Sequence, residues 1–323
     1  MFTRLSLLRF VSLVSSFSDF DGCRVLVTGA SGFLGTHLCR RLRALGAEVH
    51  AVSRSAPVGP REVMSWNCVD LADEAAARAV LGRIRPEVLF HLSGYVVGAP
   101  DLSNVLPTFR NDLMTAVNVL TFATEMRVAR IVLAGSLEEP DGDQPPASPY
   151  AAAKCAVRIY SRLFHSLYGT PVATVRVFMT YGPGPQRPNK LLPYTIVSLL
   201  RGEAPKLSSG QRGVDWIYID DVIGGLLAAG RAPGIEGGCF DLGSGELIPI
   251  RTIVQLLCQI IGTDVQPQFG AIPDRPNERI RVASLAESAA KLMWRPQTAL
   301  EDGLRRTVEW YRNNWKESLA GSP

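Results

Sequence analysis

The sequence predicts an α/β protein: a doubly wound parallel sheet followed by a smaller C-terminal α/β lobe. Short β-rich runs alternate with helical patterns as far as residue 176, which is typical of a parallel sheet with helices on both faces. The first run passes through a glycine-rich turn into a helix. The C-terminal part is rich in Pro and Gly and its elements are interrupted, as in lobes built from loops on a rigid scaffold. We divide the chain into an extension at 1–21, the sheet domain at 22–178, a second lobe at 179–315 that returns in part to the sheet, and a tail at 316–323.

Composition narrows the classes of function. The 323 residues are 46% hydrophobic, which is enough to bury a large core. The net charge of +4 is spread thinly. The one tight basic run, at Arg40, Arg41 and Arg43, is interpreted as a solvated helix face. We therefore expect no nucleic-acid partner.

Cysteine, histidine and apolar patterning favour a cytoplasmic protein without a metal. The six cysteines form no Cys-x-x-Cys pair and the four histidines share no ligand spacing, so we expect reduced thiols and no metal site. No run of 18 apolar residues is present, so no membrane span is expected. The first 20 residues contain no acid before Asp19. A transit peptide or an amphipathic surface helix is the alternative to the plain extension that we expect there.

The first strand and the turn after it carry the strongest motif. The run Cys23–Thr28 is β-rich, and a helical pattern follows from Thr36 to Leu45. Strand, glycine turn and helix in this order are the context that a dinucleotide fingerprint requires. The pyrophosphate would lie at the positive N-terminus of the helix. The motif predicts a Rossmann-type sheet and a cofactor site that includes Gly29, Ser31, Gly32, Phe33, Leu34 and Gly35.

Each glycine of this turn has a separate reason. Gly29 permits the tight turn, and Gly32 lets the backbone approach the pyrophosphate. Gly35 lets the helix and the strand pack closely. A glycine turn without a ligand is the alternative interpretation.

The end of the second strand bears on the choice of cofactor. The strand 48–52 ends at Ser53 and Arg54, where an NAD enzyme usually has an acid for the ribose hydroxyls. An arginine at this place would instead accept a 2′-phosphate. We therefore favour NADP(H) over NAD(H). The alternative is a surface arginine beside NAD that is bound through backbone contacts.

The next elements add cofactor candidates. A strand-like run at 62–67 leads to Asp70 and Leu71, and Asp70 is placed to touch the adenine. A helix is expected near 73–82, and then a strand at 88–92. His91 lies inside this apolar strand, so we interpret it as a buried, hydrogen-bonded side chain rather than a catalyst.

The following helix and strand lead to the proposed chemistry. A helix is expected from about Val105 to Arg127, with Asn111 in it. The apolar strand 130–135 then ends at Ser136. Ligands bind beyond the carboxyl ends of such parallel strands, so Ser136 is a candidate for holding a reacting oxygen.

Tyr150 and Lys154 are the candidate proton-transfer pair. Apolar residues recur at a period of 3.6 through a helix that begins at Pro149 and ends at Gly169. Tyr150 and Lys154 are therefore one turn apart on one face. A free phenol has a pKa near 10, and an adjacent ammonium favours its phenolate. We expect Lys154 to lower the pKa of Tyr150 so that it works as a general acid or base.

With the glycine turn, Ser136, Tyr150 and Lys154 in this order, residues 22–314 resemble the extended short-chain dehydrogenase/reductase family, of the NAD-dependent epimerase/dehydratase type. The resemblance implies that Tyr150 exchanges a proton with a sugar oxygen, that Ser136 hydrogen-bonds the same oxygen, and that Lys154 also binds the nicotinamide ribose. It implies nucleotide-sugar substrates and extends the cofactor site to Leu92 and Ser93. Further matching segments are 90–93, 176–183, 215–221, 273–276 and 293–296.

The residues after Ser136 help to distinguish between the reactions known in this family. Related 4,6-dehydratases have an Asp-Glu pair there, whereas this chain has Leu137 and Glu138. Leucine cannot protonate a leaving hydroxyl, which argues against that reaction. The segment 135–139 is most similar to nucleotide-sugar 4-ketoreductases, and so is 52–54, so we favour 4-keto reduction. A 4-epimerase with tightly bound NAD is the alternative, followed by a reductase of a non-nucleotide carbonyl compound and by a dinucleotide-sensing binding protein. Glu138 remains a candidate catalytic residue.

The resemblance also implies substrate contacts and a homodimer. Met179 stands where the family usually has an Asn that contacts the sugar or diphosphate, and Val214 stands where it usually has an Arg. Lys190, Arg212 and Arg275 are the candidates for binding a diphosphate. Family members often dimerise through two helices per subunit, which here are those near 105–127 and 150–168. Apolar Val117, Leu120 and Ile159 fit such an interface and equally fit an internal core.

Overall fold

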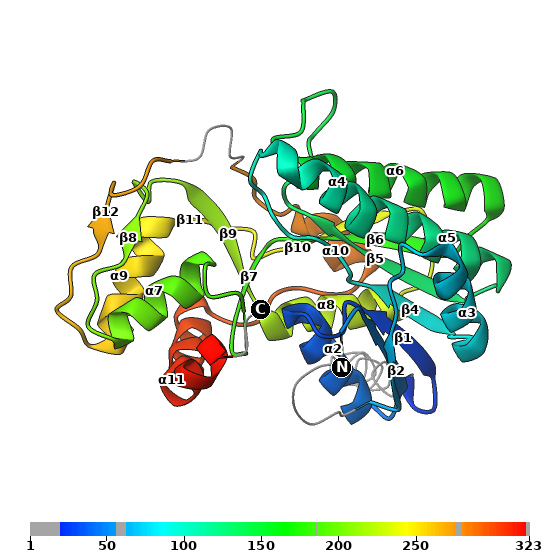
Figure 1. Cartoon of the computed structure of the whole chain (residues 1–323), viewed down its shortest axis with the longest axis horizontal. Coiled ribbons are helices and arrows are strands. Elements are labelled where there is room, and N and C mark those ends of the chain that lie inside the picture. Colours follow the sequence, from blue (N-terminus) through cyan, green and yellow to red (C-terminus); the bar gives the residue numbers. More distant parts are fainter. Residues whose placement is uncertain (1–19, 56–62, 185, 275–279, 321–323) are drawn as a thin grey trace, which may run out of the picture.

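The computed structural model describes residues 20–55, 63–184, 186–274 and 280–320. A seven-stranded sheet of strand order β10-β6-β5-β4-β1-β2-β3 forms the larger part of the molecule (Figure 1). Every pairing in it is parallel. The expected α/β fold with a doubly wound parallel sheet is thereby confirmed. The strands are β1 (Arg24–Thr28), β2 (Glu48–Ser53), β3 (Ser65–Cys68), β4 (Val88–His91), β5 (Arg130–Ser136), β6 (Val172–Val177) and β10 (Cys239–Leu242).

Helices cover both faces of this sheet. On one face, α2 (Phe33–Ala44) and α8 (Ile219–Arg231) pack against each other and against the strands. On the other face lie α3 (Glu74–Ile84), α5 (Thr115–Glu125) and α6 (Pro149–Tyr168). Local signals set the ends of α6, because the Ser148 hydroxyl accepts the N–H of Ala151 and Gly169 adopts a left-handed conformation.

The second lobe is built on a small sheet of order β11-β9-β7. It lies on the left in Figure 1, together with a two-stranded sheet and helices from the C-terminal part of the chain. One strand of the main sheet, β10, comes from the part of the chain that follows β9, and α10 (Leu285–Lys291) packs on it. The remaining elements are β7 (Met179–Tyr181), β8 (Lys206–Leu207), β9 (Gly213–Tyr218), β11 (Leu247–Pro249), β12 (Gln268–Phe269), α7 (Leu191–Leu200), α9 (Ile250–Ile261) and α11 (Leu300–Ala320).

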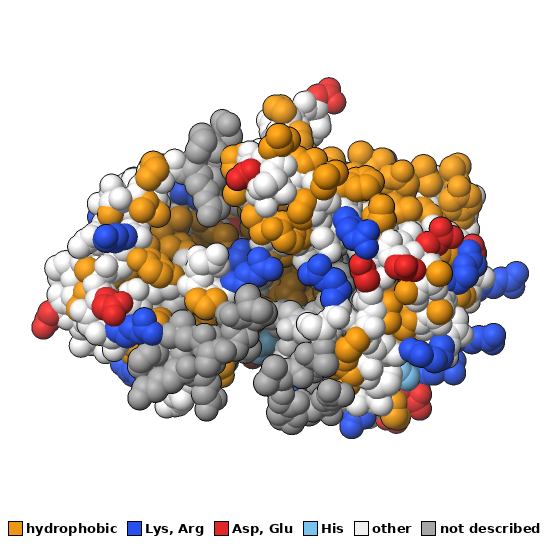
Figure 2. Space-filling model, viewed as in Figure 1, with side chains coloured by type: hydrophobic (Ala, Val, Ile, Leu, Met, Phe, Trp, Pro, Cys, Tyr) orange, Lys and Arg blue, Asp and Glu red, His pale blue; other side chains and the backbone are white. Residues whose placement is uncertain are grey.

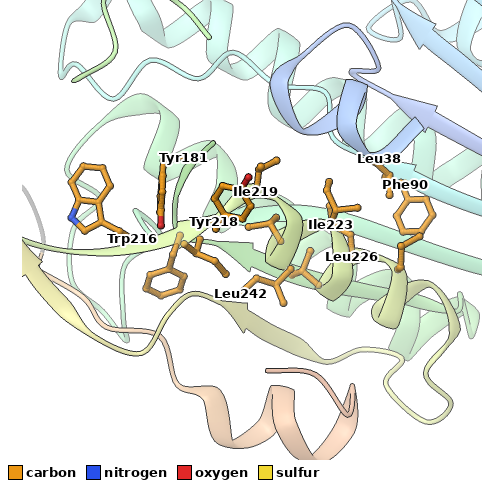
Figure 3. Close-up of a cluster of buried hydrophobic side chains, with 14 of the residues drawn as sticks. Leu38, Phe90, Tyr181, Trp216, Tyr218, Ile219, Ile223, Leu226 and Leu242 are labelled. Atoms are coloured by element: carbon orange, nitrogen blue, oxygen red, sulfur yellow. The ribbon is translucent and has the colours of Figure 1, made fainter. Parts of the chain in front are cut away.

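One hydrophobic core joins the two parts. Figure 3 follows it from Trp216 and Tyr181 in the second lobe, through Ile223 of α8, to Phe90 and Leu38 in the main sheet and α2. These side chains are buried and belong to one cluster. The shared core fixes the second lobe over the carboxyl ends of the strands, where the sequence predicts the site.

The helix expected at 105–127 differs most from its prediction. A short 3-10 turn (η2, Leu102–Asn104) and α4 (Val105–Thr108) precede a π-helical segment, η3 (Phe109–Met114), before α5 begins. A π segment inserts one residue into the turn, which hydrophobic periodicity does not reveal. The helix ends earlier than expected, at Glu125, because the chain turns through a positive φ of 55° at Arg127.

Smaller differences concern element ends and the termini. The helix α2 begins at Phe33 rather than Thr36, since Gly32 is its N-cap, and the third strand runs from Ser65 to Cys68. Nearly all of the expected extension at 1–21 lies outside the described residues. The domain boundaries stay predictions.

Several properties concern the described residues alone. None of their helices combines the length and hydropathy that crossing a bilayer requires. The six cysteines are free thiols. Among these residues no group of three His, Cys, Asp or Glu side chains is arranged to hold a metal ion.

Candidate active site

The glycine turn between β1 and α2 is closely packed. Gly29 has a φ of +66°, and a Cβ on it would lie 2.7 Å from the carbonyl carbon of Leu92. A Cβ on Gly35 would overlap the carbonyl oxygen of Gly29. Both positions therefore exclude any side chain. The two glycines bring the turn, the end of β4 and the start of α2 together, as the motif predicts.

The N-terminus of α2 fits an anionic group. Gly32 is its N-cap and offers no side-chain cap, and the first turn contains no acid. Ser31 and Gly32 are exposed, while Phe33 and Leu34 are half-buried. The first N–H groups of a helix have no partner within it, so an anionic group can accept them, and the helix dipole favours a negative charge there. These residues fit a dinucleotide pyrophosphate.

Two arginines lie near the carboxyl ends of β2 and β3. Arg54 follows β2, and Arg110 on η3 reaches Asp70, which follows β3. Arg54 Nη1 donates to Asn111 Oδ1 at 2.8 Å, and Arg110 Nη2 pairs with Asp70 Oδ2 at 2.7 Å. Both arginines are exposed, whereas Leu71 is buried. The π segment η3 thus brings Arg110 and Asn111 to the Arg54 and Asp70 side chains that the sequence assigns to the cofactor.

The residues at the end of β4 pack beside the glycine turn and β1. His91 is buried, its Nδ1 is hydrogen-bonded with Thr28 Oγ1 at 2.8 Å, and Ser93 N donates to the same hydroxyl at 3.3 Å. Burial lowers the pKa of His91 to about 3, and the Lys154 charge acts in the same direction. The expectation of a buried, hydrogen-bonded histidine is confirmed. Ser93 and Leu92 lie against the glycine turn.

Ser136 is held by a buried carboxylate that the sequence did not suggest. Glu139 has a side chain with no exposed surface; its Oε1 accepts the N–H of Ser136 at 2.8 Å, and its Oε2 pairs with Arg158 Nε at 2.8 Å. Burial raises the pKa of Glu139, while these two partners act in the opposite direction. The turn after β5 is therefore anchored to α6, which fixes Ser136 beside the helix that carries Tyr150.

Tyr150 and Lys154 are both buried on α6. Lys154 Nζ donates to Ala134 O at 3.0 Å and lies 3.3 Å from Asp112 Oδ1. Burial raises the pKa of Tyr150, and the Lys154 charge and a hydrogen bond with Ser136 oppose that rise without cancelling it. Lys154 thus acts in the expected direction, while the desolvation of the phenol acts in the opposite direction.

Glu138 lies close to these groups. Its Oε2 is 3.5 Å from the Ser148 hydroxyl, and its backbone N–H donates to Ser136 Oγ at 3.2 Å. Its charge contributes to the raised pKa of Tyr150. Leu137 beside it is half-buried against the core, so this turn offers one carboxylate next to the phenol.

The substrate candidates are placed differently from one another. Met179 begins β7, two residues after Val177, which pairs with Ser136 across β5 and β6. Lys190 is the N-cap of α7, and Arg212 precedes β9 and accepts the N–H of Ile250 through its carbonyl. Figure 2 shows a hollow between the second lobe and the sheet domain. Arg275 lies outside the described residues.

Four contributors to the site escaped the sequence interpretation: Asp112, Glu139, Arg110 and Arg281. Arg281 Nη1 donates to Glu139 O at 2.9 Å and its Nη2 pairs with Asp141 at 2.6 Å. An acid in an apolar helical stretch is the signal that could have singled out Asp112. The other three carry no comparable signal, and each of them has a charged or carbonyl partner that is distant in sequence.

Known proteins resemble the chain over most of its length. The family model described as NAD dependent epimerase/dehydratase family matches residues 25–243. A UDP-glucose 4-epimerase from Mycolicibacterium smegmatis is 28% identical and covers 90% of this chain and 99% of its own. The structure of UDP-glucose 4-epimerase from Thermotoga maritima with UDP-glucose has a TM-score of 0.82 at 25% identity, and that of MoeE5 with UDP-glucuronic acid and NAD has 0.81 at 26%; each alignment covers 90% of this chain and 99% of the other.

The family match spans the strands, the glycine turn and the Ser136, Tyr150 and Lys154 positions. It agrees with the parallel sheet and with the packing of these side chains. The chain therefore belongs to the NAD-dependent epimerase/dehydratase family of extended short-chain dehydrogenase/reductase enzymes, whose members act on nucleotide sugars.

Proposed function

We propose that this enzyme transfers hydride at the 4-position of a nucleotide-linked hexose and that its overall reaction is 4-epimerisation. The observation that carries the proposal is the convergence of Ser136, Tyr150 and Lys154 in one buried site beyond the carboxyl end of β5. The names of the similar proteins support the substrate class and the 4-epimerase assignment.

Tyr150 is the proton-transfer residue of the mechanism. Its phenolate takes the proton of the sugar 4-hydroxyl, and its phenol returns that proton once the carbonyl is reduced again. Ser136 donates a hydrogen bond to the same oxygen and so holds it against the phenol. The bound nicotinamide supplies the acceptor and donor of hydride. Epimerisation requires the sugar carbonyl to present its other face before hydride returns, so no net oxidation occurs.

Lys154 has two roles in this proposal. Its ammonium favours the phenolate of Tyr150 by direct charge attraction. It also binds the ribose next to the nicotinamide, as the family resemblance implies. Burial strengthens both interactions because water does not screen them.

A 4-keto reduction is the second candidate, and Arg54 is the observation that favours it. The guanidinium lies at the end of β2, where a 2′-phosphate would be bound. NADP(H) would then serve as a dissociable reductant. Similar structures hold NAD or NADH, which supports the epimerase instead.

Leu137 is the residue that argues against a dehydration reaction. Loss of a hydroxyl as water requires an acid close to the leaving oxygen. The side chain at this position is a hydrocarbon packed against the core. The turn retains Glu138 as its one carboxylate beside Tyr150, so we assign no elimination step to the enzyme.

A homodimer accompanies the proposal. Exposed apolar side chains gather over η2, α4 and α6, in the upper right of Figure 2. Leu120 is fully buried in the core and is not part of this surface, whereas Ile159 is 58% exposed. A second copy of the chain is the occupant that we propose, because the surface lies on two adjacent helical segments that can pair as a four-helix bundle. The surface consists of Leu102, Val105, Leu106, Phe109, Ile159, Tyr160, Leu163, Leu167 and Tyr168.

One experiment separates the two reactions. The purified enzyme is incubated with UDP-glucose or UDP-glucuronic acid without added cofactor, and the sugar is followed by proton NMR. We expect the C4 epimer, and mass spectrometry of the denatured protein should release NAD. An enzyme that releases no cofactor and oxidises added NADPH only with a 4-keto sugar nucleotide is the reductase. Failure of both reactions with UDP- and dTDP-linked hexoses would refute the proposal.

A further inference from the structure

A buried carboxylate lies behind the catalytic lysine. Asp112 is on the π segment η3, and its side chain has no exposed surface. Its Oδ2 accepts the backbone N–H of Tyr95 at 3.0 Å, and its Oδ1 lies 3.3 Å from Lys154 Nζ. The ammonium also donates to Ala134 O at 3.0 Å. Two acceptors thus hold the Lys154 ammonium.

The surrounding backbone leaves room for this ion pair. A Cβ on Gly94 would lie 2.6 Å from Asp112 Oδ1 and 3.4 Å from Lys154 Nζ. Any side chain at Gly94 would therefore displace the carboxylate. The loop after β4, the π segment and α6 meet at this point, and each supplies one part of the arrangement.

Asp112 lies on the same π segment as Arg110 and Asn111. Its neighbours Arg110 and Asn111 contact Asp70 and Arg54 at the outer edge of the sheet. Three consecutive residues therefore contact both the side chains proposed to bind the cofactor and the catalytic lysine. A π segment inserts an extra residue into the turn, and such segments are frequent at functional sites.

Several charges act on Tyr150 and Lys154 together. From η3 comes Asp112, from the turn after β5 come Glu138 and Glu139, and from β4 comes His91. Burial keeps His91 neutral near pH 7. Lys154 is the one cation among these groups, and Asp112 is the carboxylate with a direct ion pair to it. The attraction that Lys154 exerts on the phenolate is therefore opposed by a carboxylate behind it.

We propose that Asp112 is a positioning residue. Its carboxylate holds the Lys154 ammonium in place and partly compensates its positive charge, so that Lys154 stabilises the phenolate of Tyr150 less strongly. The inference rests on the proton-transfer role proposed for Tyr150. A neighbouring charge shifts the pH at which a phenol takes and returns its proton. Asp112 therefore sets the pH range in which Tyr150 exchanges its proton.

The test neutralises Asp112 and titrates Tyr150 directly. Asp112→Asn keeps the shape and an acceptor for Tyr95 N–H. The phenolate absorbance is recorded after rapid pH jumps, and the titration of a Tyr150→Phe protein with the same change at position 112 is subtracted to isolate Tyr150. We expect the midpoint to move to lower pH by about one unit, since a nearby charge shifts the pKa of a neighbouring group by about one to three units.

A matched variant tests whether any buried ion pair has this effect. Asp241→Asn also neutralises a buried carboxylate, which pairs with Arg176 Nε at 2.6 Å and accepts the N–H of Ser284. It is not among the groups that act on Tyr150. Its titration midpoint should equal that of the parent. If Asp112→Asn does not fold, Asp112→Ser is neutral and keeps a hydroxyl for Tyr95 N–H.

The pH dependence of turnover is a second test of the proposal. The limb of the pH–rate profile that Tyr150 controls should move to lower pH, whether Tyr150 is the base of hydroxyl oxidation or the acid of carbonyl reduction. A folded, neutral variant at position 112 whose titration midpoint is unchanged or higher overturns the proposal. The titration needs no sugar, so it also decides the matter if the enzyme proves not to be an epimerase.

Discussion

The carboxylate of Glu139 accepts the backbone N–H of Ser136 at 2.8 Å, three residues away across a tight turn. The same carboxylate pairs with Arg158 on the third turn of α6. One side chain therefore ties the end of β5 to the helix that carries Tyr150. The distance between the Ser136 hydroxyl and the Tyr150 phenol depends on this connection.

Glu139→Ala should weaken both stability and catalysis. The change leaves the Ser136 N–H buried without a partner and Arg158 without its anion. We expect a loss of about 2–3 kcal/mol in the free energy of unfolding, measured with urea. Glu139→Gln retains an acceptor and should lose less than the alanine variant. Equal stabilities for the two variants would contradict the role given to the hydrogen bond.

Tyr150→Phe should remove turnover and leave cofactor binding unchanged. The variant lacks only the phenolic oxygen, so the loss should be about 10²–10⁴-fold, as for other general acids and bases. Product formation and the dissociation constant for the nicotinamide cofactor are measured on the same preparation. Activity within a few-fold of the parent would show that the proton moves through another group.

Arg54→Ala should distinguish the two cofactors. If the guanidinium binds a 2′-phosphate, the variant should lose about 10- to 100-fold in affinity for NADPH and little for NADH, because a charge-assisted hydrogen bond contributes about 1.5–3 kcal/mol. Fluorescence titration with each nucleotide measures this. Arg41→Ala, on the exposed last turn of α2, is the control. Equal losses for both nucleotides would rule out phosphate recognition by Arg54.

His91→Asn should change how stability depends on pH. His91 has a folded pKa of about 3, whereas a free histidine has a pKa of 6.5, so below pH 6.5 the unfolded chain takes up a proton that the folded protein does not. Stability is therefore lost as the pH falls from 6.5 towards 3, by about 2 kcal/mol between pH 7 and pH 5. The asparagine variant can keep the hydrogen bond with Thr28 and should lack this component. Urea unfolding at the two pH values tests it, and parallel pH dependences would be inconsistent with a neutral buried imidazole.

Ile159→Asp should yield monomers. The charge lies in the exposed apolar surface of α6 that we propose as the dimer interface, and its desolvation on association would be costly. Sedimentation at micromolar concentration measures the mass. Ile272→Asp places the same charge on a 48% exposed isoleucine of the other lobe and should leave the dimer intact. A parent protein that is itself monomeric would refute the interface.

Local patterns predicted the parts of the site that depend on neighbours in sequence. The glycine turn and the Tyr150–Lys154 spacing follow from backbone geometry within one turn, and both are found with the expected packing. The order of strands and helices likewise follows from alternation and from short connections. These features need no knowledge of what lies across the sheet.

The contacts that tune the site were not predictable in this way. Asp112 reaches Lys154 from 42 residues earlier in the chain, on a π segment that hydrophobic periodicity does not reveal. Arg281 reaches the carbonyl of Glu139 from the far end of the chain. Hydrophobic periodicity reports which face of an element is buried and says nothing about which charge it meets. The raised pKa of Tyr150 has the same origin, since burial is a property of the whole fold.

The edge strand β10 has a consequence for how such enzymes diversify. Because residues 239–242 complete the cofactor-binding sheet after the chain has built one part of the second lobe and before it builds the rest, the two parts are interleaved along the polypeptide. A cut at any single point between them leaves the sheet without its last strand. A single recombination event between two related genes therefore cannot exchange the whole second lobe and leave the sheet complete. New substrate preferences must arise within the loops of the second lobe, while the strands on either side of them stay in register.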